Sequence, residues 1–172
     1  QRQMCIRDRY SHLYLCIAGE LAAVICIYDP LRAEAKDAIR ALHACGISKV
    51  VMMTGDNRRT AASVAEEVGV DEFYAEVLPE DKAAFIRREK AAGRTVIMIG
   101  DGVNDSPALS EADAGVAIST GAAIAREIAD ITIASEDLFE LVTLRKISEA
   151  LMGRIHRNYR FIVGFNLGLI VF

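Results

Sequence analysis

Apolar and polar residues are arranged in short blocks along most of this chain, and their spacing alternates between the periods of strands and helices. Two mostly apolar runs, 13–17 and 21–28, flank Ala18-Gly19-Glu20, a sequence typical of a hairpin turn. Further apolar runs predict strands near 49–53, 73–76, 95–99, 114–118 and 131–134. Helical spacing predicts helices near 33–45, 58–68, 80–92, 105–112 and 121–129. This alternation is typical of a parallel, doubly wound α/β sheet, which is the fold class that we expect.

The last part of the chain has a different pattern. After Asp137 only Gly153 interrupts a long helical stretch, so we predict a stalk helix over 137–160. Residues 161–172 carry no charge, and basic residues precede them: Arg145, Lys146, Arg154, Arg157 and Arg160. Twelve helical residues span about 18 Å, less than the roughly 30 Å of a bilayer core, so a buried core helix is the alternative. The basic residues favour a transmembrane helix that begins in 161–172 and enters the membrane from the cytoplasm. We therefore expect residues 13–160 to be cytoplasmic.

Composition restricts the classes of function. The chain has 172 residues, of which 52% are hydrophobic and 26% charged, enough for one domain with a substantial core. Its net charge of −4 argues against a surface that binds nucleic acid. No two of the four cysteines have C-x-x-C spacing, so neither a zinc site nor a redox dithiol is indicated. Cys16 and Cys26 either face each other across the hairpin or, as is more usual, are reduced and buried.

The main chemical signal is Gly-Asp-Gly-Val-Asn-Asp-Ser-Pro at residues 100–107. Asp101 and Asp105 follow a predicted strand, at the carboxyl edge of the sheet, where open α/β folds bind ligands. Paired carboxylates suit Mg²⁺, which keeps bound waters and takes its remaining ligands from phosphate. We therefore expect Asp101 and Asp105 to hold Mg²⁺ at a site of phosphoryl transfer.

Two further segments support a phosphate site. Thr-Gly-Asp at 54–56 joins a predicted strand to a predicted helix, whose first N–H groups attract phosphate. Pro-Glu-Asp-Lys at 79–82 is typical of a first helical turn, which puts Lys82 on a rigid element as a positive charge for phosphate. Each segment alone is commonly an ordinary turn or a solvated lysine. Their joint occurrence at strand–helix junctions favours a functional site.

These motifs closely resemble the phosphorylation domain of P-type ATPases, a branch of the haloacid dehalogenase-like fold. The resemblance runs from about Leu13 to the end of the sequence and includes Asp29-Pro30-Leu31-Arg32, which is similar to the family's Asp-x-x-Arg element. The short spacing between Asn57 and Pro79 resembles the heavy-metal-transporting class, because calcium and sodium pumps carry longer insertions there. The potassium-transporting bacterial class is the nearer alternative.

The resemblance implies an ATP-driven transporter of transition-metal cations that cycles through an aspartyl phosphate. It implies these catalytic-site residues: Thr54, Gly55, Asp56, Lys82, Asp101, Asn104 and Asp105. Asp101 binds Mg²⁺ in this reading, and Asp105 supports the ion directly or through water. Lys82 and the Thr54–Gly55 turn hold the phosphoryl oxygens, and Asn104 orients the site. The implied partners are ATP, the metal cation, membrane lipid and the remainder of the pump.

Asn166 lies in the uncharged segment, where an unsatisfied amide is costly. We assign it either to the pathway of the transported ion or to a hydrogen bond between helices. Copper pumps of this class tend to carry Tyr-Asn in this helix and zinc pumps a Lys. This chain has Phe165-Asn166, so the identity of the metal stays open.

The Asp-Lys-Thr-Gly-Thr motif, whose Asp is phosphorylated in P-type pumps, does not occur in this sequence. We therefore expect an inactive piece of a pump, in which Asp29 has a structural or hinge role with Arg32. Its expected parts are 1–12, unassigned and foreign to the domain; 13–136, a partial phosphorylation domain with an N-terminal hairpin; 137–160, the stalk; and 161–172, the start of a transmembrane helix.

Two alternatives belong to other classes of protein. A soluble haloacid dehalogenase-like phosphatase requires an upstream Asp-x-Asp nucleophile and no membrane helix. A non-catalytic partner domain tolerates the loss of the nucleophile but has no reason to keep both acids and Lys82.

Overall fold

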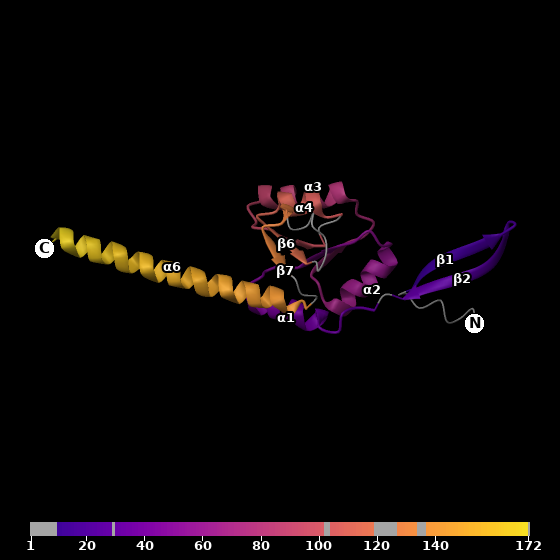
Figure 1. The fold of residues 1–172 in the computed structure, drawn as a ribbon, viewed down its shortest axis with the longest axis horizontal. Helices are drawn as coiled ribbons and strands as arrows, with labels where there is room; N and C mark the ends of the chain where they lie inside the picture. The colour runs from indigo at the N-terminus through magenta and orange to yellow at the C-terminus, as the bar shows by residue number, and fades with distance from the viewer. Residues whose placement is uncertain (1–9, 29, 102–103, 119–126, 134–136, 172) are drawn as a thin grey trace.

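The computed structural model describes residues 10–28, 30–101, 104–118, 127–133 and 137–171 (Figure 1). An α/β body lies in the middle of the molecule. A hairpin projects from one end of this body, and a long helix extends from the other (Figure 1).

The order of elements follows the predicted alternation. The strands are β1 Tyr10–Ile17, β2 Glu20–Tyr28, β3 Val51–Met53, β4 Glu72–Tyr74, β5 Ile97–Gly100, β6 Ala114–Ile118 and β7 Ile131–Ile133. The helices are α1 Ala35–Ala44, α2 Arg58–Val68, α3 Pro79–Ala91, α4 Ser106–Glu111 and α6 Phe139–Val171. The helix expected near 121–129 lies mostly outside the described residues.

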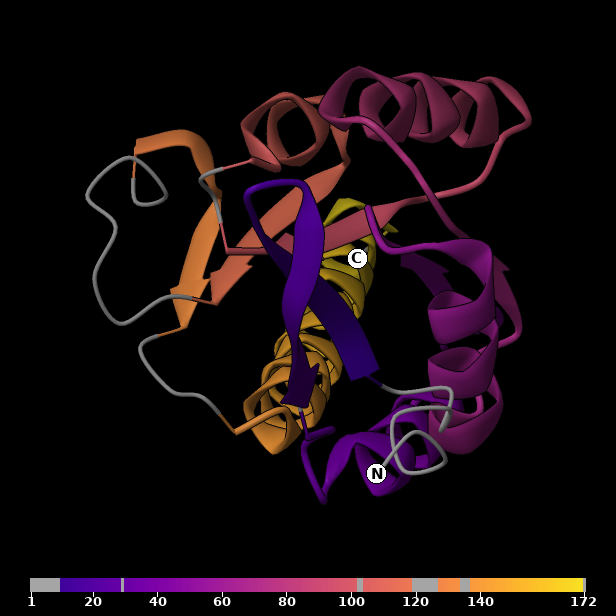
Figure 2. The same cartoon turned by 90° about the vertical axis from the view of Figure 1, so that its right-hand side faces the viewer.

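All pairing within the described α/β body is parallel, which confirms the predicted fold class. Strand β3 pairs with β4, and β5, β6 and β7 form a second hydrogen-bonded group in that order. Helices α3 and α4 lie on one side of these strands, and α1 and the start of α6 lie on the other (Figures 1 and 2). Helices on both sides of parallel strands are the arrangement of a doubly wound fold.

The hairpin has a two-residue turn, and its register corrects one expectation. Ala18 and Gly19 both have positive φ, at 53° and 84°, as in the tight turns that match the twist of paired strands. The register puts Cys16 opposite Leu21, and Cys26 lies far along the other strand. The two cysteines therefore do not face each other. Cys16 is a free, exposed thiol, so the prediction of a buried thiol there is wrong as well.

A buried cluster fixes α3 and α4 against β5. Its fully packed members are Ile86, Met98, Ala108 and Leu109. Helix α4 also approaches β6 closely, since a Cβ on Gly115 would lie 2.7 Å from the carbonyl oxygen of Leu109. This packing holds the first turns of α3 and α4, which carry the predicted site residues, on a common support.

Aspartate carboxylates bind backbone N–H groups at the amino ends of the strands, at the opposite edge of the sheet. Three aspartates each lie directly before a strand, and each accepts a backbone N–H next to the first residue of the strand that comes before it in the sequence. The pairs and their N–O distances are Asp71 with Val50 (2.6 Å), Asp113 with Val96 (2.8 Å) and Asp130 with Gly115 (2.8 Å). These side chains stabilise the sheet at the edge away from the predicted site.

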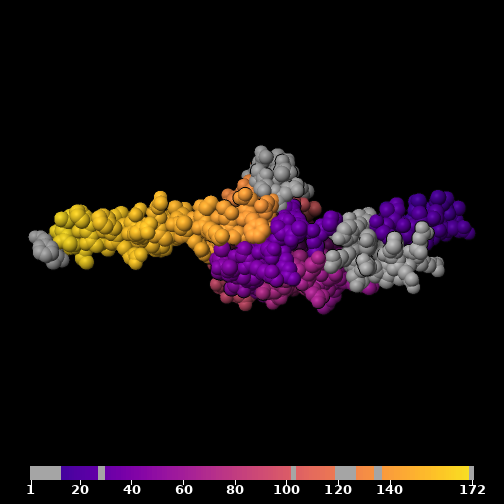
Figure 3. Space-filling view, turned by 90° about the horizontal axis from the view of Figure 1, so that it is seen from below, coloured from indigo at the N-terminus to yellow at the C-terminus, as the bar shows by residue number. Residues whose placement is uncertain are grey.

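Helix α6 is one continuous helix of 33 residues. It begins where the Asp137 carboxylate accepts the N–H of Phe139 at 2.9 Å. Leu141 and Val142 are buried, and the Arg145 guanidinium donates to the carbonyl oxygen of Cys45 at 3.1 Å. Beyond these turns the helix leaves the body, while α1 lies against its first part (Figure 3). Among the described residues, no helix contains a stretch long and apolar enough to cross a bilayer.

Candidate functional site

The residues that follow β5 form the centre of the candidate site. Asp101 comes directly after the strand and is exposed, as is Asn104, whereas residues 102–103 lie outside the described part of the chain. Asp105 is the N-cap residue of α4. A Cβ on Gly100 would lie 2.5 Å from Oδ2 of Asp105. Glycine at position 100 therefore leaves the space in which the Asp105 carboxylate lies against the strand end.

Lys82 and Asp105 form a close ion pair. The Lys82 Nζ lies 2.7 Å from Oδ1 of Asp105, and their side chains are only 15% and 13% exposed. The Asp105 side chain makes no capping hydrogen bond to its own helix, because it is turned towards the lysine. Charge-assisted hydrogen bonds of this kind are short and strong, and burial makes the loss of either partner costly.

The start of α3 positions Lys82. Pro79 occupies the first helical turn, and the Asp81 carboxylate accepts the backbone N–H of Leu78 at 3.3 Å. The predicted first turn with a lysine on a rigid element is thus present. The direct bond between that lysine and Asp105 was not predicted, since the two residues lie 23 positions apart and the sequence gives no distance between them.

The Thr54 turn also has a defined geometry. The Thr54 hydroxyl donates to Oδ2 of Asp56 at 2.8 Å and accepts the Asp56 N–H at 3.1 Å. A Cβ on Gly55 would meet no atom within 4 Å, so the backbone is open to a ligand there. The Asn57 side chain then accepts the N–H of Thr60 at 3.0 Å and begins α2, as the strand–turn–helix prediction requires.

Backbone hydrogen bonds join this turn to the segment after β4. The Thr54 N–H donates to the Tyr74 carbonyl at 3.0 Å, and the Val77 N–H donates back to the Thr54 carbonyl at 3.0 Å. The Glu76 N–H donates to the Asp56 carbonyl at 2.9 Å, with φ of 56° at Glu76. Sequence analysis did not identify Glu76, because a glutamate carries no local signal for a positive φ.

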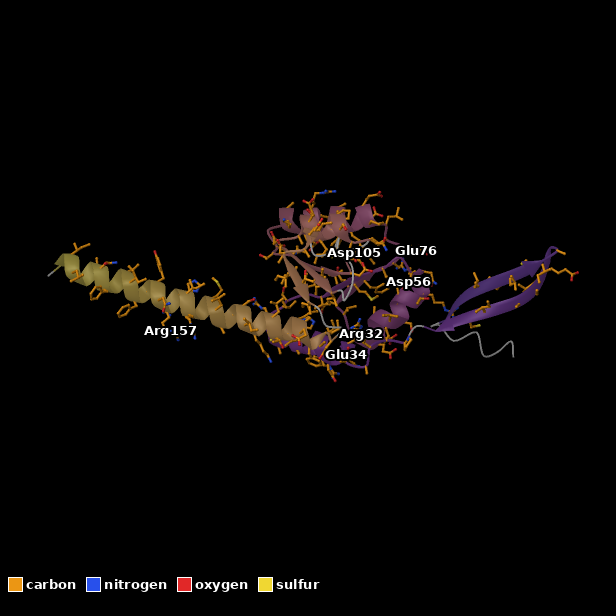
Figure 4. The ribbon with its side chains drawn as sticks, in the orientation of Figure 1. Arg32, Glu34, Asp56, Glu76, Asp105 and Arg157 are labelled. Atoms are coloured by element: carbon orange, nitrogen blue, oxygen red, sulfur yellow. The ribbon has the colours of Figure 1, made fainter. Side chains whose placement is uncertain are left out.

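The predicted site residues come from the segments after β3 and β5 and from the starts of α3 and α4. In Figure 4 the labelled side chains of Asp56 and Glu76 lie next to each other, and Asp105 lies on the same side of the body in that view. Within the described ranges, no group of three or more His, Cys, Asp or Glu side chains could hold a metal ion. The donors that the sequence predicts are the two carboxylates after β5, Asp101 and Asp105. Such a set fits Mg²⁺, which is usually held by one or two carboxylates together with waters and phosphate oxygens.

Two carboxyl groups with a lowered pKa lie away from this site. A hydrogen bond from Lys49 lowers the pKa of Glu72, the first residue of β4. The backbone N–H of Val96 does the same for the pKa of Asp113, with Lys90 adding to the effect. Both carboxyl groups are at the amino ends of strands, so they serve the stability of the sheet.

A separate cavity lies where the segment before α1 meets the start of α6. It has a volume of about 450 Å³ and is lined by Arg32, Glu34, Asp137 and Phe139. Figure 4 shows Arg32 and Glu34 near the start of α6, below the predicted site in that view. Asp29, which we paired with Arg32 as a hinge, lies outside the described residues. Asn166 is exposed on the distal part of α6, and its role in an ion pathway stays a prediction.

The chain resembles known proteins along most of its length. The family model of the haloacid dehalogenase-like hydrolases matches residues 4–113. Copper-transporting ATPase 2 of Rhizobium meliloti is 46% identical over 160 residues, which are 93% of this chain and 19% of that protein. The silver exporting P-type ATPase of Salmonella typhimurium is also 46% identical, over 90% of this chain and 19% of that protein.

Solved structures agree with these relatives. A zinc-transporting PIB-type ATPase in the E2.Pi state matches 91% of this chain and 26% of its own, at 34% identity and a TM-score of 0.76. The catalytic CPx-ATPase domain CopB-B matches 77% of this chain and 53% of its own, at 31% identity and a TM-score of 0.64. The chain thus spans about a fifth of the length of the curated relatives quoted above.

Proposed function

Because this chain belongs to the haloacid dehalogenase-like hydrolase family and its relatives are metal-transporting P-type ATPases, we propose that it is part of such a pump. In this proposal it supplies the Mg²⁺- and phosphate-binding part of the site at which ATP phosphorylates the pump. The observation that carries the proposal is the close Lys82–Asp105 pair at the starts of α3 and α4, with Asp101 directly after the parallel strand β5.

Lys82 binds phosphoryl oxygens in the proposed mechanism. An ammonium group has three N–H donors, and Asp105 accepts one of them at 2.7 Å. The others are directed to the transferred phosphoryl group, whose charge the ammonium stabilises. Asp105 fixes the position of Lys82 before the substrate arrives, so little reorganisation is needed during the reaction.

Asp101 and Asp105 hold Mg²⁺ in this proposal. The bound ion would neutralise part of the charge on the transferred phosphoryl group. Asp101 is exposed at the strand end and accessible as a ligand, while Oδ2 of Asp105 lies in the space left by Gly100. Asn104, between the two acids, orients the site by hydrogen bonding.

The Thr54 turn offers further donors to phosphate. Gly55 has open space where a side chain would lie, and Asp56 keeps the Thr54 hydroxyl in a fixed orientation. Phosphoryl transfer depends on positioning and on charge stabilisation, and a rigid turn provides the first of these.

The phosphorylated aspartate belongs to a different segment of the pump in this proposal. The sequence contains no Asp-Lys-Thr-Gly-Thr motif, so the groups described here bind and position without a nucleophile. ATP, a transition-metal cation, membrane lipid and the remaining segments are the proposed partners. Residues 13–160 are cytoplasmic and 161–172 enter the membrane, with Asn166 facing the interior of the helix bundle.

Phosphorylation of the full-length pump by labelled ATP tests this function. The variant Asp101→Asn should abolish the acid-stable phosphoenzyme, and Lys82→Ala should reduce it severely, because each loses a charge at the reacting group. Asp37→Asn is the matched control, since Asp37 is exposed on α1 and forms a surface ion pair with Arg40. Wild-type turnover in the Asp101→Asn pump would refute the assignment.

A further inference from the structure

The backbone at Glu76 is unusual for its residue type. Among the described residues, only Ala18 and Glu76 are non-glycine residues with positive φ, and Ala18 belongs to the hairpin turn. A non-glycine residue in the left-handed region is uncommon and is maintained only when its surroundings require it. Glu76 lies beside the Thr54 turn and six residues before Lys82.

We propose that Glu76 is a positioning residue of the phosphate site, and that it acts through its left-handed backbone. In this role it holds the Thr54 turn against the chain segment that starts the Lys82 helix. The inference rests on the proposed function and adds to it a residue that touches neither Mg²⁺ nor phosphate.

Two consecutive backbone N–H groups, those of Glu76 and Val77, connect this segment to the Thr54 turn. The Glu76 N–H bonds to the Asp56 carbonyl at 2.9 Å, and the Val77 N–H bonds to the Thr54 carbonyl at 3.0 Å. In an extended strand, successive N–H groups point in opposite directions, so only one of them could reach the turn. A left-handed residue turns successive N–H groups to one side, which lets both bond to the same turn.

The connection continues directly into α3. Val77 is followed by Leu78, the N-cap residue of α3, whose carbonyl accepts the N–H of Lys82 at 3.2 Å. A single residue therefore separates the Val77 hydrogen bond from the beginning of the helix. Fixing Val77 against Thr54 sets the distance between the two groups that we assign to phosphate, the Thr54 turn and Lys82.

The Glu76 side chain is not part of this connection. It is exposed, and it has no hydrogen-bond or ion-pair partner in the part of the chain that the structure describes. The contribution of Glu76 is thus its backbone conformation. This distinction gives a test, because residue types differ in how readily they adopt the left-handed region. Glycine and asparagine enter it readily, and β-branched residues strongly disfavour it.

The experiment compares E76G, E76N and E76V in the full-length pump, with E66V as the control. Glu66 is exposed on α2, so its replacement makes the same chemical change at ordinary helical backbone. The rate of phosphoenzyme formation should fall about 5- to 30-fold in E76V, which corresponds to about 1–2 kcal/mol of backbone strain. We expect E76G and E76N to stay within about twofold of the unmodified pump.

Hydrogen exchange on the same proteins separates the two proposals. The peptide containing Val77 should exchange faster in E76V and as slowly as the unmodified protein in E76G, while peptides from β6 stay unchanged in both. Equal loss of phosphoenzyme in E76G, E76N and E76V would assign the role to the carboxylate and overturn the inference, as would wild-type behaviour of E76V. A pump that forms no phosphoenzyme even unmodified contradicts the proposed function, and the exchange results still decide the role of the Glu76 backbone.

Discussion

Replacing Lys82 by alanine should destabilise the fold as well as impair the proposed chemistry. The substitution leaves the Asp105 carboxylate, only 13% exposed, without the ammonium group that lies 2.7 Å away. Breaking one partner of a buried ion pair costs about 3–5 kcal/mol, and hydrogen bonds to charged groups contribute about 1.5–3 kcal/mol. Because both side chains keep some contact with solvent, we expect a loss of about 3 kcal/mol in the free energy of unfolding.

Urea denaturation of this chain, followed by circular dichroism, measures that loss. Lys36→Ala is the control, since Lys36 is exposed on α1 and should change the free energy of unfolding by less than about 0.5 kcal/mol. The double variant Lys82→Ala/Asp105→Ala removes both charges and should recover part of the loss, because no buried charge is left unpaired. A cost below about 1 kcal/mol for Lys82→Ala, or strict additivity in the double variant, would refute this account of the pair.

Three other results are expected. Gly100→Ala introduces a Cβ 2.5 Å from the Asp105 carboxylate, so it should lower the free energy of unfolding, measured in urea, by about 1–3 kcal/mol. It should also weaken Mg²⁺ binding measured by calorimetry, and an unchanged Mg²⁺ affinity would argue against Asp105 as a ligand. The Val96 N–H lowers the pKa of Asp113 from its ordinary value of 3.8. The ionised Asp113 carboxylate therefore stabilises the fold above pH 3.8, and this stabilisation is lost as the pH falls through the lowered pKa. Asp113→Asn should thus reduce the difference between urea midpoints at pH 6 and pH 3, and an unchanged difference would contradict the role of that hydrogen bond. This chain alone, incubated with γ-labelled ATP and Mg²⁺, should remain unlabelled, because it lacks the Asp-Lys-Thr-Gly-Thr motif that carries the nucleophile. Hydroxylamine-sensitive label on it would show that another aspartate accepts the phosphoryl group.

Local sequence signals were sufficient for most of the α/β body. Asn57 and Gly69 mark the two ends of α2, where the asparagine side chain caps the first turn and the glycine has φ of 80°. Apolar runs located β3 and β5 to within a few residues, because the strands of parallel sheets are rich in apolar residues. The Gly-Asp-Gly motif likewise lies at the end of β5, where the apolar run before it predicted a strand end.

Features that depend on distance between elements were not predictable in this way. The Lys82–Asp105 pair results from the packing of α3 and α4 on one core, which no local pattern encodes. The error at Cys16 and Cys26 has a similar origin. The two-residue turn at Ala18 and Gly19, together with an irregularity after Leu15, sets the register of the hairpin and separates the two cysteines.

The attachment of α6 has a mechanical consequence. Within the described residues, the helix is held near its start, by the burial of Leu141 and Val142 and by the bond from Arg145 to the carbonyl of Cys45, just after α1. From Lys146 to Val171 it extends about 40 Å at 1.5 Å per residue. A rigid arm of this length converts a tilt of about 5° at its base into a displacement of about 3–4 Å at its tip. Small rotations of the α/β body are therefore amplified along α6, so that a small change of angle at its base becomes a displacement of several ångströms at its far end.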